Sequence, residues 1–193
     1  MRRYFCIIQK EVKTMKLFIA SDIHGSYFYA EKMIEAYRKE KCDKLVLLGD
    51  VLYHGPRNDL PKEYAPKKVI TLLNELKDEI IAIRGNCDAE VDQMVLEFPI
   101  MDDYKIIDVD GIKICITHGH VYNEEKHPQE DFQVLLSGHT HIPKKIKVGK
   151  IICMNPGSVS IPKENSHHGY MIFENGKFLW KDFERKEVRI NEF

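Results

Sequence analysis

Five short apolar runs stand out in the hydrophobic pattern of this 193-residue chain. Each run is followed by polar residues, as is typical of short strands that a sheet buries on both faces. We predict these strands at Leu17–Ala20, Leu45–Leu48, Ile80–Ile83, Ile114–Ile116 and Val134–Leu136. Between the first three runs, apolar residues recur at the i, i+3, i+4, i+7 spacing of amphipathic helices, over Tyr27–Glu40 and Pro66–Lys77. The first half therefore predicts a β-α-β-α-β order with parallel strands.

The second half of the chain carries strand and turn signals without helical periodicity. Tyr104–Asp110 and Ile112–Thr117 flank the dipeptide Asp110-Gly111, which favours a tight hairpin turn. Four more strand-like segments follow at Lys144–Val148, Ile151–Met154, Gly169–Glu174 and Phe178–Phe183. We therefore expect a β-rich, antiparallel second half and, for the whole chain, a layered α/β sandwich.

Composition and charge indicate a globular protein without a membrane segment. The net charge of -1 excludes a broad basic surface for long nucleic acid. No apolar run approaches the roughly 20 residues of a membrane helix, and five scattered cysteines without a C-x-x-C pair indicate reduced thiols in the cytoplasm. With no linker or repeat, we expect a single domain over residues 15–193. Residues 1–14 are expected to be an extension, which an upstream start codon would explain.

Polar, metal-compatible residues follow directly after all five apolar runs. Ligand sites of open α/β sheets gather at the carboxyl ends of strands, so we expect these residues to meet in space. Members of the D-x-H and H-x-H pairs are expected to point the same way along an extended chain. The candidate ligands are two aspartates, one asparagine and four histidines: Asp22, His24, Asp50, Asn86, His118, His139 and His141.

This donor set predicts a centre with two metal ions. Seven ligands are too many for one tetrahedral ion and suit two ions about 3.5–4 Å apart that share a carboxylate bridge. Mixed nitrogen and oxygen donors favour manganese, iron, zinc, cobalt or nickel over calcium, and we expect manganese first. When Asp22, Asp50 and a hydroxide are set against two divalent ions, one positive charge remains, which matches a single phosphodiester anion.

In their order along the chain, the motifs D-x-H, G-D, G-N, H and G-H-x-H resemble the calcineurin-like metallophosphoesterases. The G-N-C-D variant at Gly85–Asp88 and the segments 49–58 and 155–162 resemble the small bacterial phosphodiesterases of the YfcE type. The resemblance covers about residues 15–181 and implies a four-layer αββα sandwich. It also implies one ion on Asp22, His24 and His141 and a second on Asn86, His118 and His139, with Asp50 between them.

The resemblance implies hydrolysis of a small-molecule phosphodiester by a hydroxide that bridges the ions and attacks phosphorus in line. Catalytic roles then fall on Asp50, Asn86 and His118. Larger family members carry G-N-H-D/E and use that histidine to protonate the leaving oxygen. Cys87 stands at this position here, and a thiol with an ordinary pKa of about 8.5 is a poor substitute. We therefore expect slow hydrolysis of esters with poor leaving groups.

Other residues near these motifs have more than one interpretation. His54 and His120 are candidate proton donors, and Asp88 is a candidate for orienting a neighbouring histidine. Arg57 and Asn58 fit either a substrate contact or an ordinary surface loop, while Asn86 is expected to contact substrate as well as metal. The segment 155–158 fits either a structural turn near the site or a direct substrate contact.

Two other functions compete with the phosphodiesterase hypothesis. A phosphomonoesterase or nucleotide phosphatase would need more cationic side chains at the site, and only Arg57 and Arg84 lie near the motifs in sequence. The retromer subunit of eukaryotes resembles this fold and is a protein-binding scaffold, but a scaffold has no reason to keep seven ligands. We expect a small-molecule substrate, no membrane partner, and a homodimer or higher homo-oligomer.

Overall fold

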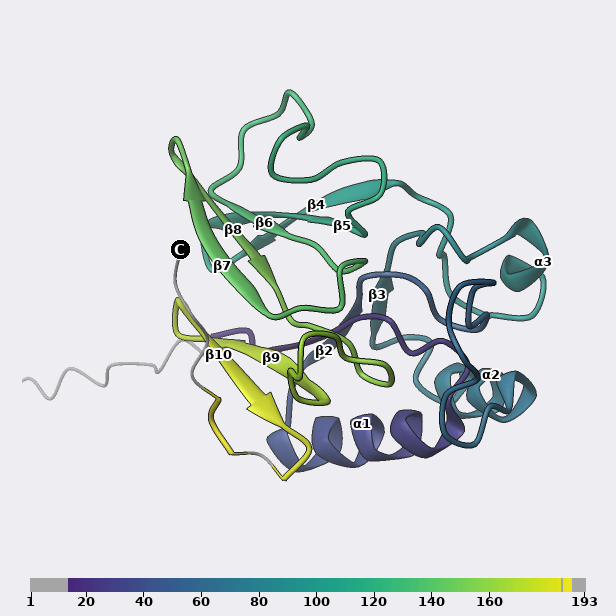
Figure 1. Cartoon of the computed structure of the whole chain (residues 1–193). Helices are drawn as coiled ribbons and strands as arrows, with labels where there is room; N and C mark the ends of the chain where they lie inside the picture. The colour runs from purple at the N-terminus through teal and green to yellow at the C-terminus, as the bar shows by residue number, and fades with distance from the viewer. Residues whose placement is uncertain (1–13, 185, 189–193) are drawn as a thin grey trace, which may run out of the picture.

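The computed structural model describes residues 14–184 and 186–188. Two five-stranded sheets pack face to face, with helices along one outer side (Figure 1). The first sheet has the order β10-β9-β1-β2-β3, where the strands are β1 (Leu17–Ala20), β2 (Lys44–Leu47), β3 (Ile80–Ala82), β9 (Gly169–Glu174) and β10 (Lys177–Asp182). The second has the order β4-β5-β6-β8-β7, where the strands are β4 (Tyr104–Val109), β5 (Ile112–Thr117), β6 (Val134–Leu136), β7 (Lys144–Val148) and β8 (Ile151–Asn155).

The directions of the strands confirm the first-half prediction and correct the second. Strands β1, β2 and β3 are parallel, as the β-α-β-α-β pattern predicts. The second half is mixed and not antiparallel, because β6 is parallel to both β5 and β8. The chain between β5 and β6, residues 118–133, is long enough for the crossover that parallel neighbours need. Strands β9 and β10 join the first sheet in antiparallel pairing.

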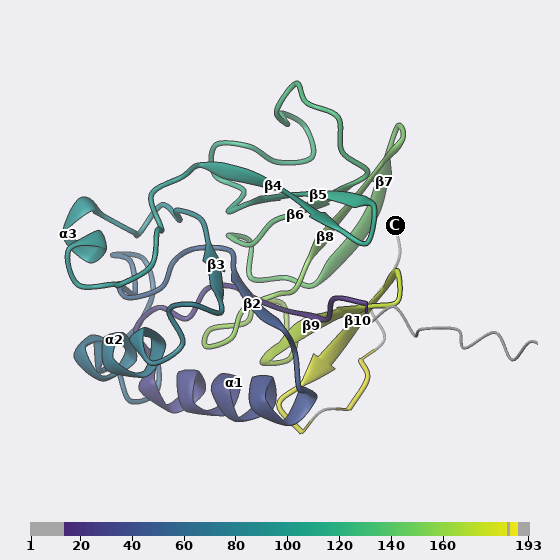
Figure 2. The same cartoon turned by 180° about the vertical axis from the view of Figure 1, so that it is seen from behind.

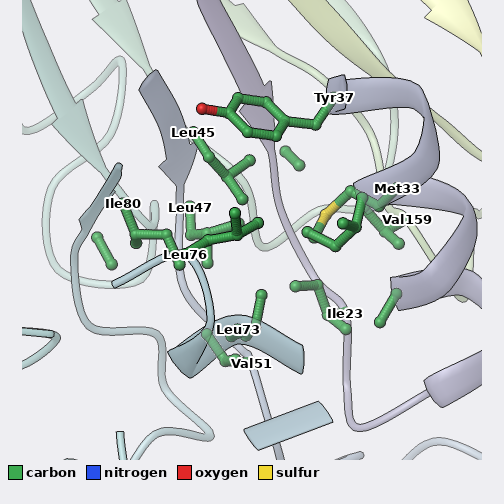
Figure 3. Close-up of a cluster of buried hydrophobic side chains, with 14 of the residues drawn as sticks. Ile23, Met33, Tyr37, Leu45, Leu47, Val51, Leu73, Leu76, Ile80 and Val159 are labelled. Carbon is green, nitrogen blue, oxygen red and sulfur yellow. The ribbon is translucent and has the colours of Figure 1, made fainter. Parts of the chain in front are cut away.

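Strands β1 and β2 read as continuous apolar runs because each of their faces is buried in a different core. Leu17 and Ile19 point between the two sheets, together with residues such as Leu136. Phe18 and Ala20 point the other way, into the core under the helices. Figure 3 shows this second core, where Leu45, Leu47 and Ile80 meet Met33, Tyr37 and Leu73.

Helix α1 (Tyr27–Glu40) occupies the residues predicted for it. The Ser26 hydroxyl accepts the backbone N–H of Tyr29 at its start, and Lys41 takes the left-handed conformation that ends it. Helix α2 (Pro66–Asn74) begins at the predicted proline but ends earlier than predicted, because the backbone N–H of Leu76 bonds the Leu73 carbonyl in a tighter turn. A single short helix, α3 (Glu90–Gln93), follows β3.

The outer face of the second sheet is covered by irregular chain. Phe132 packs there on Cys115, Leu135 and Cys153, and the ring of Tyr122 lies edge-on to that of Tyr104. Figure 2 shows this covering loop on the side opposite α1 and α2. The predicted layered sandwich of two mixed sheets flanked by helices is therefore confirmed, with irregular chain over the outer face of the second sheet.

Two further expectations concern the ends of the chain and the membrane. The extension predicted for residues 1–14 lies outside the described residues except for Thr14, whose hydroxyl donates a hydrogen bond to Asn175. Within the described part of the chain, no helix has both the length and the apolar character needed to cross a bilayer.

Candidate active site

The seven candidate ligands lie on loops that leave the carboxyl ends of five strands. Asp22 and His24 follow β1, Asp50 follows β2 and Asn86 follows β3 in the first sheet. The other three residues follow strands of the second sheet: His118 follows β5, and His139 and His141 follow β6. The site thus forms where the ends of both sheets meet.

Asp22, His24 and His141 form one buried group of potential metal ligands. The Oδ1 atom of Asp22 lies 3.2 Å from Nε2 of His141 and 3.6 Å from Nε2 of His24. The two Nε2 atoms are 3.3 Å apart. All three residues are at most 3% exposed, so these atoms lie away from bulk solvent.

The outer nitrogens of three histidines bind backbone carbonyls. Nδ1 of His24 lies 2.8 Å from the Tyr53 carbonyl, and Nδ1 of His141 lies 2.8 Å from that of Ile161. Nδ1 of His118 lies 2.6 Å from the Leu48 carbonyl. A carbonyl only accepts hydrogen bonds, so Nδ1 carries a proton, and each ring in its neutral form turns a lone pair on Nε2 toward the centre. This arrangement is typical of metal-binding histidines.

Asp50 stands between two sets of donors. Its Oδ2 atom lies 3.6 Å from Nε2 of His24 and 3.3 Å from Nε2 of His118. Nε2 of His118 in turn lies 3.1 Å from Oδ1 of Asn86. The other oxygen of Asp50 accepts the backbone N–H of Cys87 at 2.8 Å, which helps to hold the carboxylate between both sets.

His139 belongs to the site but not to the tight groups of ligand atoms. Its ring stands 5.1 Å from that of His118, centroid to centroid, and lines the cavity described below. Its backbone N–H donates to Oδ2 of Asp22 at 3.1 Å, so the loop after β6 is tied to the loop after β1.

The backbone conformation at these residues differs from the expected one. We expected extended chain at the D-x-H and H-x-H pairs. Instead, all four residues of these pairs take positive φ angles, and so does Asp50: Asp22 (59°), His24 (49°), Asp50 (55°), His139 (68°) and His141 (62°). Isolated left-handed residues turn the chain sharply, and each costs about 1–3 kcal/mol for a residue other than glycine. The fold therefore holds strained backbone where the side chains converge, as is common at functional sites.

The electrostatic environment favours cations at the centre. Burial raises the pKa of Asp22, but the neighbouring rings of His141 and His24 outweigh it and hold that pKa well below its ordinary value. Burial lowers the pKa of His118, but the hydrogen bond to Asp50 and the nearby Asp22 charge outweigh it and raise the pKa to about 9.

The residues present also fit a metal. Oδ1 of Asp22 is buried and has no hydrogen-bond partner among the described residues. The Nε2 atoms of His24 and His141 face it, but in the neutral rings the proton lies on Nδ1, which binds a backbone carbonyl. A cation that accepts lone pairs from Asp22, His24 and His141 would satisfy all three.

A cavity of about 350 Å³ opens above the centre. Its lining includes five of the candidate ligands and two candidate substrate contacts: His24, Asp50, Asn86, His139 and His141, with Arg57 and Asn58. The sequence motifs did not point to two other lining residues, Thr140 and Lys163. Thr140 is the middle residue of the H-x-H motif, and Lys163 directly follows segment 155–162, so position next to a motif was the available signal.

The two candidate proton donors lie beside the cavity and do not line it. The ring of His54 packs edge-on against Tyr53 and Tyr64, and the ring of His120 packs against that of His118 at 5.3 Å. Cys87 does line the cavity. Burial and the nearby Asp50 carboxylate raise the pKa of its thiol to about 12, so the thiol keeps its proton at neutral pH.

Asp88 binds backbone and not a histidine, which corrects the sequence-based interpretation. Its two oxygens accept the N–H groups of Asp50 at 2.8 Å, Val51 at 2.8 Å and Gly85 at 2.7 Å. The carboxylate therefore joins the loop after β2 to the loop after β3.

The structural interpretation of segment 155–158 agrees with its hydrogen bonds, which extend to Ser160. The Asn155 amide donates to the carbonyl of Gly138 at 2.6 Å, and the hydroxyls of Ser158 and Ser160 both donate to the carbonyl of Asp22. These bonds hold the ligand-bearing loops after β6 and β1.

Comparison with known proteins finds relatives that are named phosphodiesterases. Phosphodiesterase YfcE of Escherichia coli K12 is 48% identical over 164 residues, which span 83% of this chain and 88% of that protein. Phosphodiesterase MJ0936 of Methanocaldococcus jannaschii is 28% identical over 151 residues, or 74% of this chain and 83% of that one. The solved structure of E. coli YfcE, described as a phosphoesterase, matches with a TM-score of 0.87 and 43% identity over 91% of this chain and 97% of that chain.

A more distant likeness concerns the fold alone. Vps29 of Entamoeba histolytica matches with a TM-score of 0.57 and 18% identity over 92% of this chain and all of that chain. The family model for the calcineurin-like phosphoesterase superfamily domain matches residues 15–177. The chain therefore belongs to the calcineurin-like phosphoesterase superfamily, and within it to the YfcE type.

Proposed function

We propose that this protein is a dinuclear, metal-dependent phosphodiesterase that acts on a small molecule. The observation that carries the proposal is the position of Asp50, with one oxygen 3.6 Å from Nε2 of His24 and 3.3 Å from Nε2 of His118. A carboxylate between two sets of potential ligands is the arrangement that two neighbouring cations require. The names of YfcE and MJ0936 as phosphodiesterases support the same reaction.

In this proposal, Asp22, His24 and His141 hold one ion, Asn86, His118 and His139 hold the other, and Asp50 is shared. Two divalent ions, manganese being our first choice, supply an activated water nucleophile when bound and neutralise charge developing on the phosphate. Carbonyls at Tyr53, Leu48 and Ile161 orient three of the imidazoles, so the ligands need little rearrangement to bind.

The cavity walls give the other residues their proposed roles. Arg57 is exposed at the cavity and would bind a substrate oxygen through its guanidinium. The amide of Asn58 donates to the His54 carbonyl at 2.8 Å, so Asn58 holds the loop that carries Arg57. The amide nitrogen of Asn86 lies beside the Cys87 sulfur at the cavity and would donate to a phosphate oxygen. His54 and His120 stay predicted proton donors.

The phosphomonoesterase alternative is favoured by one observation. Arg84 pairs with Asp103 at 2.7 Å and does not line the cavity, but Lys163 does. Two cationic side chains therefore face the site, Arg57 and Lys163, and a monoester dianion would use both. Relative rates on diester and monoester separate the two reactions.

The decisive assay uses chelator-stripped protein with bis-p-nitrophenyl phosphate and p-nitrophenyl phosphate, with and without Mn²⁺. We expect Mn²⁺-dependent hydrolysis that favours the diester and that the Asp50→Asn variant lacks, because the amide cannot bridge two cations. Faster hydrolysis of the monoester would establish the alternative. Failure of the stripped protein to bind or use any divalent ion would contradict both enzymatic functions.

A further inference from the structure

Two cationic side chains that are not themselves candidate metal ligands line the active-site cavity. Arg57 belongs to the loop that follows β2, and Lys163 belongs to the connection between β8 and β9. Both side chains are exposed, and neither takes part in an ion pair among the described residues. Unpaired cations at a cavity wall attract anions and strengthen their binding there.

The backbone of Lys163 is held next to a metal-ligand candidate. Its N–H donates to the His141 carbonyl at 3.2 Å, and its own carbonyl accepts the N–H of Ser166 at 3.0 Å and the Ser166 hydroxyl at 2.6 Å. Glu164 and Asn165 between them take positive φ angles of 52° and 56°. This closed turn places the lysine at the cavity independently of any ligand.

The charge of the cavity exceeds what a simple diester can balance. Asp50 is the one carboxylate residue among the described residues that line it. Two divalent ions, together with Asp22, Asp50 and a hydroxide, would carry one net positive charge. A single diester anion already neutralises that charge. Arg57 and Lys163 add two positive charges to that balance. A substrate with only one negative charge would leave both cations without a partner.

We propose that the substrate is a compact phosphodiester whose alcohol part carries a further anionic group, a carboxylate or a phosphate, bound by Lys163 and Arg57. This inference rests on the proposed phosphodiesterase function and names its substrate class. A cavity of about 350 Å³ lies near the lower limit for small-molecule sites, so the second anion lies a few bonds from the phosphodiester.

Three p-nitrophenyl phosphodiesters test the proposal because they share a leaving group. Their second substituent is propyl, 2-carboxyethyl or 2-phosphonoethyl, so the first lacks the additional charge and the other two carry it as carboxylate or phosphonate. At fixed ionic strength with Mn²⁺, we expect a higher kcat/KM for at least one charged ester than for the propyl ester. The charged ester with the higher kcat/KM shows whether the second anionic group is a carboxylate or a phosphate.

The variants Lys163→Met and Arg57→Met test which side chains cause the preference. We expect each to lower the charged-to-propyl ratio of kcat/KM by about fivefold, the upper range for a solvent-exposed ion pair. Lys150→Met is the matched control, because Lys150 lies at the turn between β7 and β8 and does not line the cavity. Its ratio should equal that of the unchanged protein, and thermal unfolding of all three variants checks that they are folded.

Each other outcome overturns a defined part of the proposal. Equal kcat/KM for the three esters, with Mn²⁺-dependent turnover intact, would refute the second anion site and leave the phosphodiesterase function standing. A preference that survives both substitutions would refute the assignment to Lys163 and Arg57. No metal-dependent turnover of any ester would refute the proposed function and, with it, this substrate class.

Discussion

At the scale of single residues, Asp88 shows how a side chain outside the ligand set shapes the centre. It is 7% exposed and accepts three backbone N–H groups, among them that of Asp50. Burial raises the pKa of this carboxyl, although the bonds from Val51 and Gly85 act in the opposite direction. Its role is to position Asp50, since it lies behind the ligands and does not line the cavity.

The first residue-scale prediction replaces this carboxylate. In Asp88→Asn, an NH₂ group replaces one of the two carboxylate oxygens that accept hydrogen bonds from backbone N–H groups. Two donors then face each other, so the loop that carries Asp50 shifts. We expect Mn²⁺ affinity to fall by about ten- to a hundredfold, as for other residues that orient metal ligands. Calorimetric titration measures it, with Asp131→Asn, an exposed carboxylate far along the chain, as control. Unchanged affinity would refute the positioning role.

The second residue-scale prediction concerns Cys87. Its thiol is protonated at neutral pH, with a pKa raised to about 12 by burial and by Asp50, and it transfers that proton poorly to an alkoxide. Rates on a series of aryl phosphodiesters should therefore fall steeply as the leaving-group pKa rises. Cys87→His should reduce that slope, since imidazole is the better acid. A wild-type rate that does not vary with leaving-group pKa would count against this interpretation.

At the scale of elements, Glu40 joins the end of α1 to the first sheet. Its carboxylate lies 2.8 Å from the Lys181 ammonium on β10 and 3.5 Å from that of Lys16, and it accepts the Tyr170 hydroxyl at 3.2 Å. Burial raises the pKa of Glu40, but these partners outweigh it and lower the pKa from its ordinary value of 4.5. The carboxylate is thus more stable in the folded than in the unfolded chain.

The element-scale prediction follows from the sign of that shift. A lowered carboxyl pKa stabilises the fold above the ordinary pKa of 4.5 and loses this effect as pH falls below it. Glu40→Gln should therefore lower the free energy of unfolding by about 1 kcal/mol at pH 7, and the difference should shrink below pH 4.5. Urea unfolding at both pH values measures it. A constant difference would show that shape, not charge, accounts for the loss.

At the scale of the whole molecule, metal ligands from both sheets couple metal binding to the global fold. Asp22 and Asp50 leave the first sheet, whereas His118 and His141 leave the second, so the centre exists only in the assembled sandwich. A ligand that binds only the folded state stabilises it.

The whole-molecule prediction is a metal-dependent melting temperature. Mn²⁺ at about 100 times its Kd should add about 2.7 kcal/mol, which for a chain of this size raises Tm by roughly 5–10 °C. Differential scanning calorimetry of chelated and loaded protein measures the rise, and Asp50→Asn should reduce it. Equal Tm values with and without metal would contradict a site shared by the sheets.

Self-association and the cytoplasmic location stay predictions, the former measurable by light scattering.

Features that depend on local pattern were predictable from the sequence. Helix α1 matches its prediction from Tyr27 to Glu40 because apolar spacing and the Ser26 cap both act within a few residues. Strands β1 and β6 match because apolar side chains on both faces demand burial on both faces. The seven candidate ligands could be chosen because each stands directly after such a strand.

Only the tertiary structure decided which distant loops touch. The mixed second sheet, the left-handed ligands and the arrival of Lys163 at the cavity all depend on contacts between segments far apart in sequence. Gly138 illustrates the reason: a Cβ there would lie 1.9 Å from the Ser21 hydroxyl oxygen, across the junction of the two sheets. Hydrophobic periodicity specifies which face of an element is buried, but the packing of the two sheets determines what that face and the adjoining loops meet.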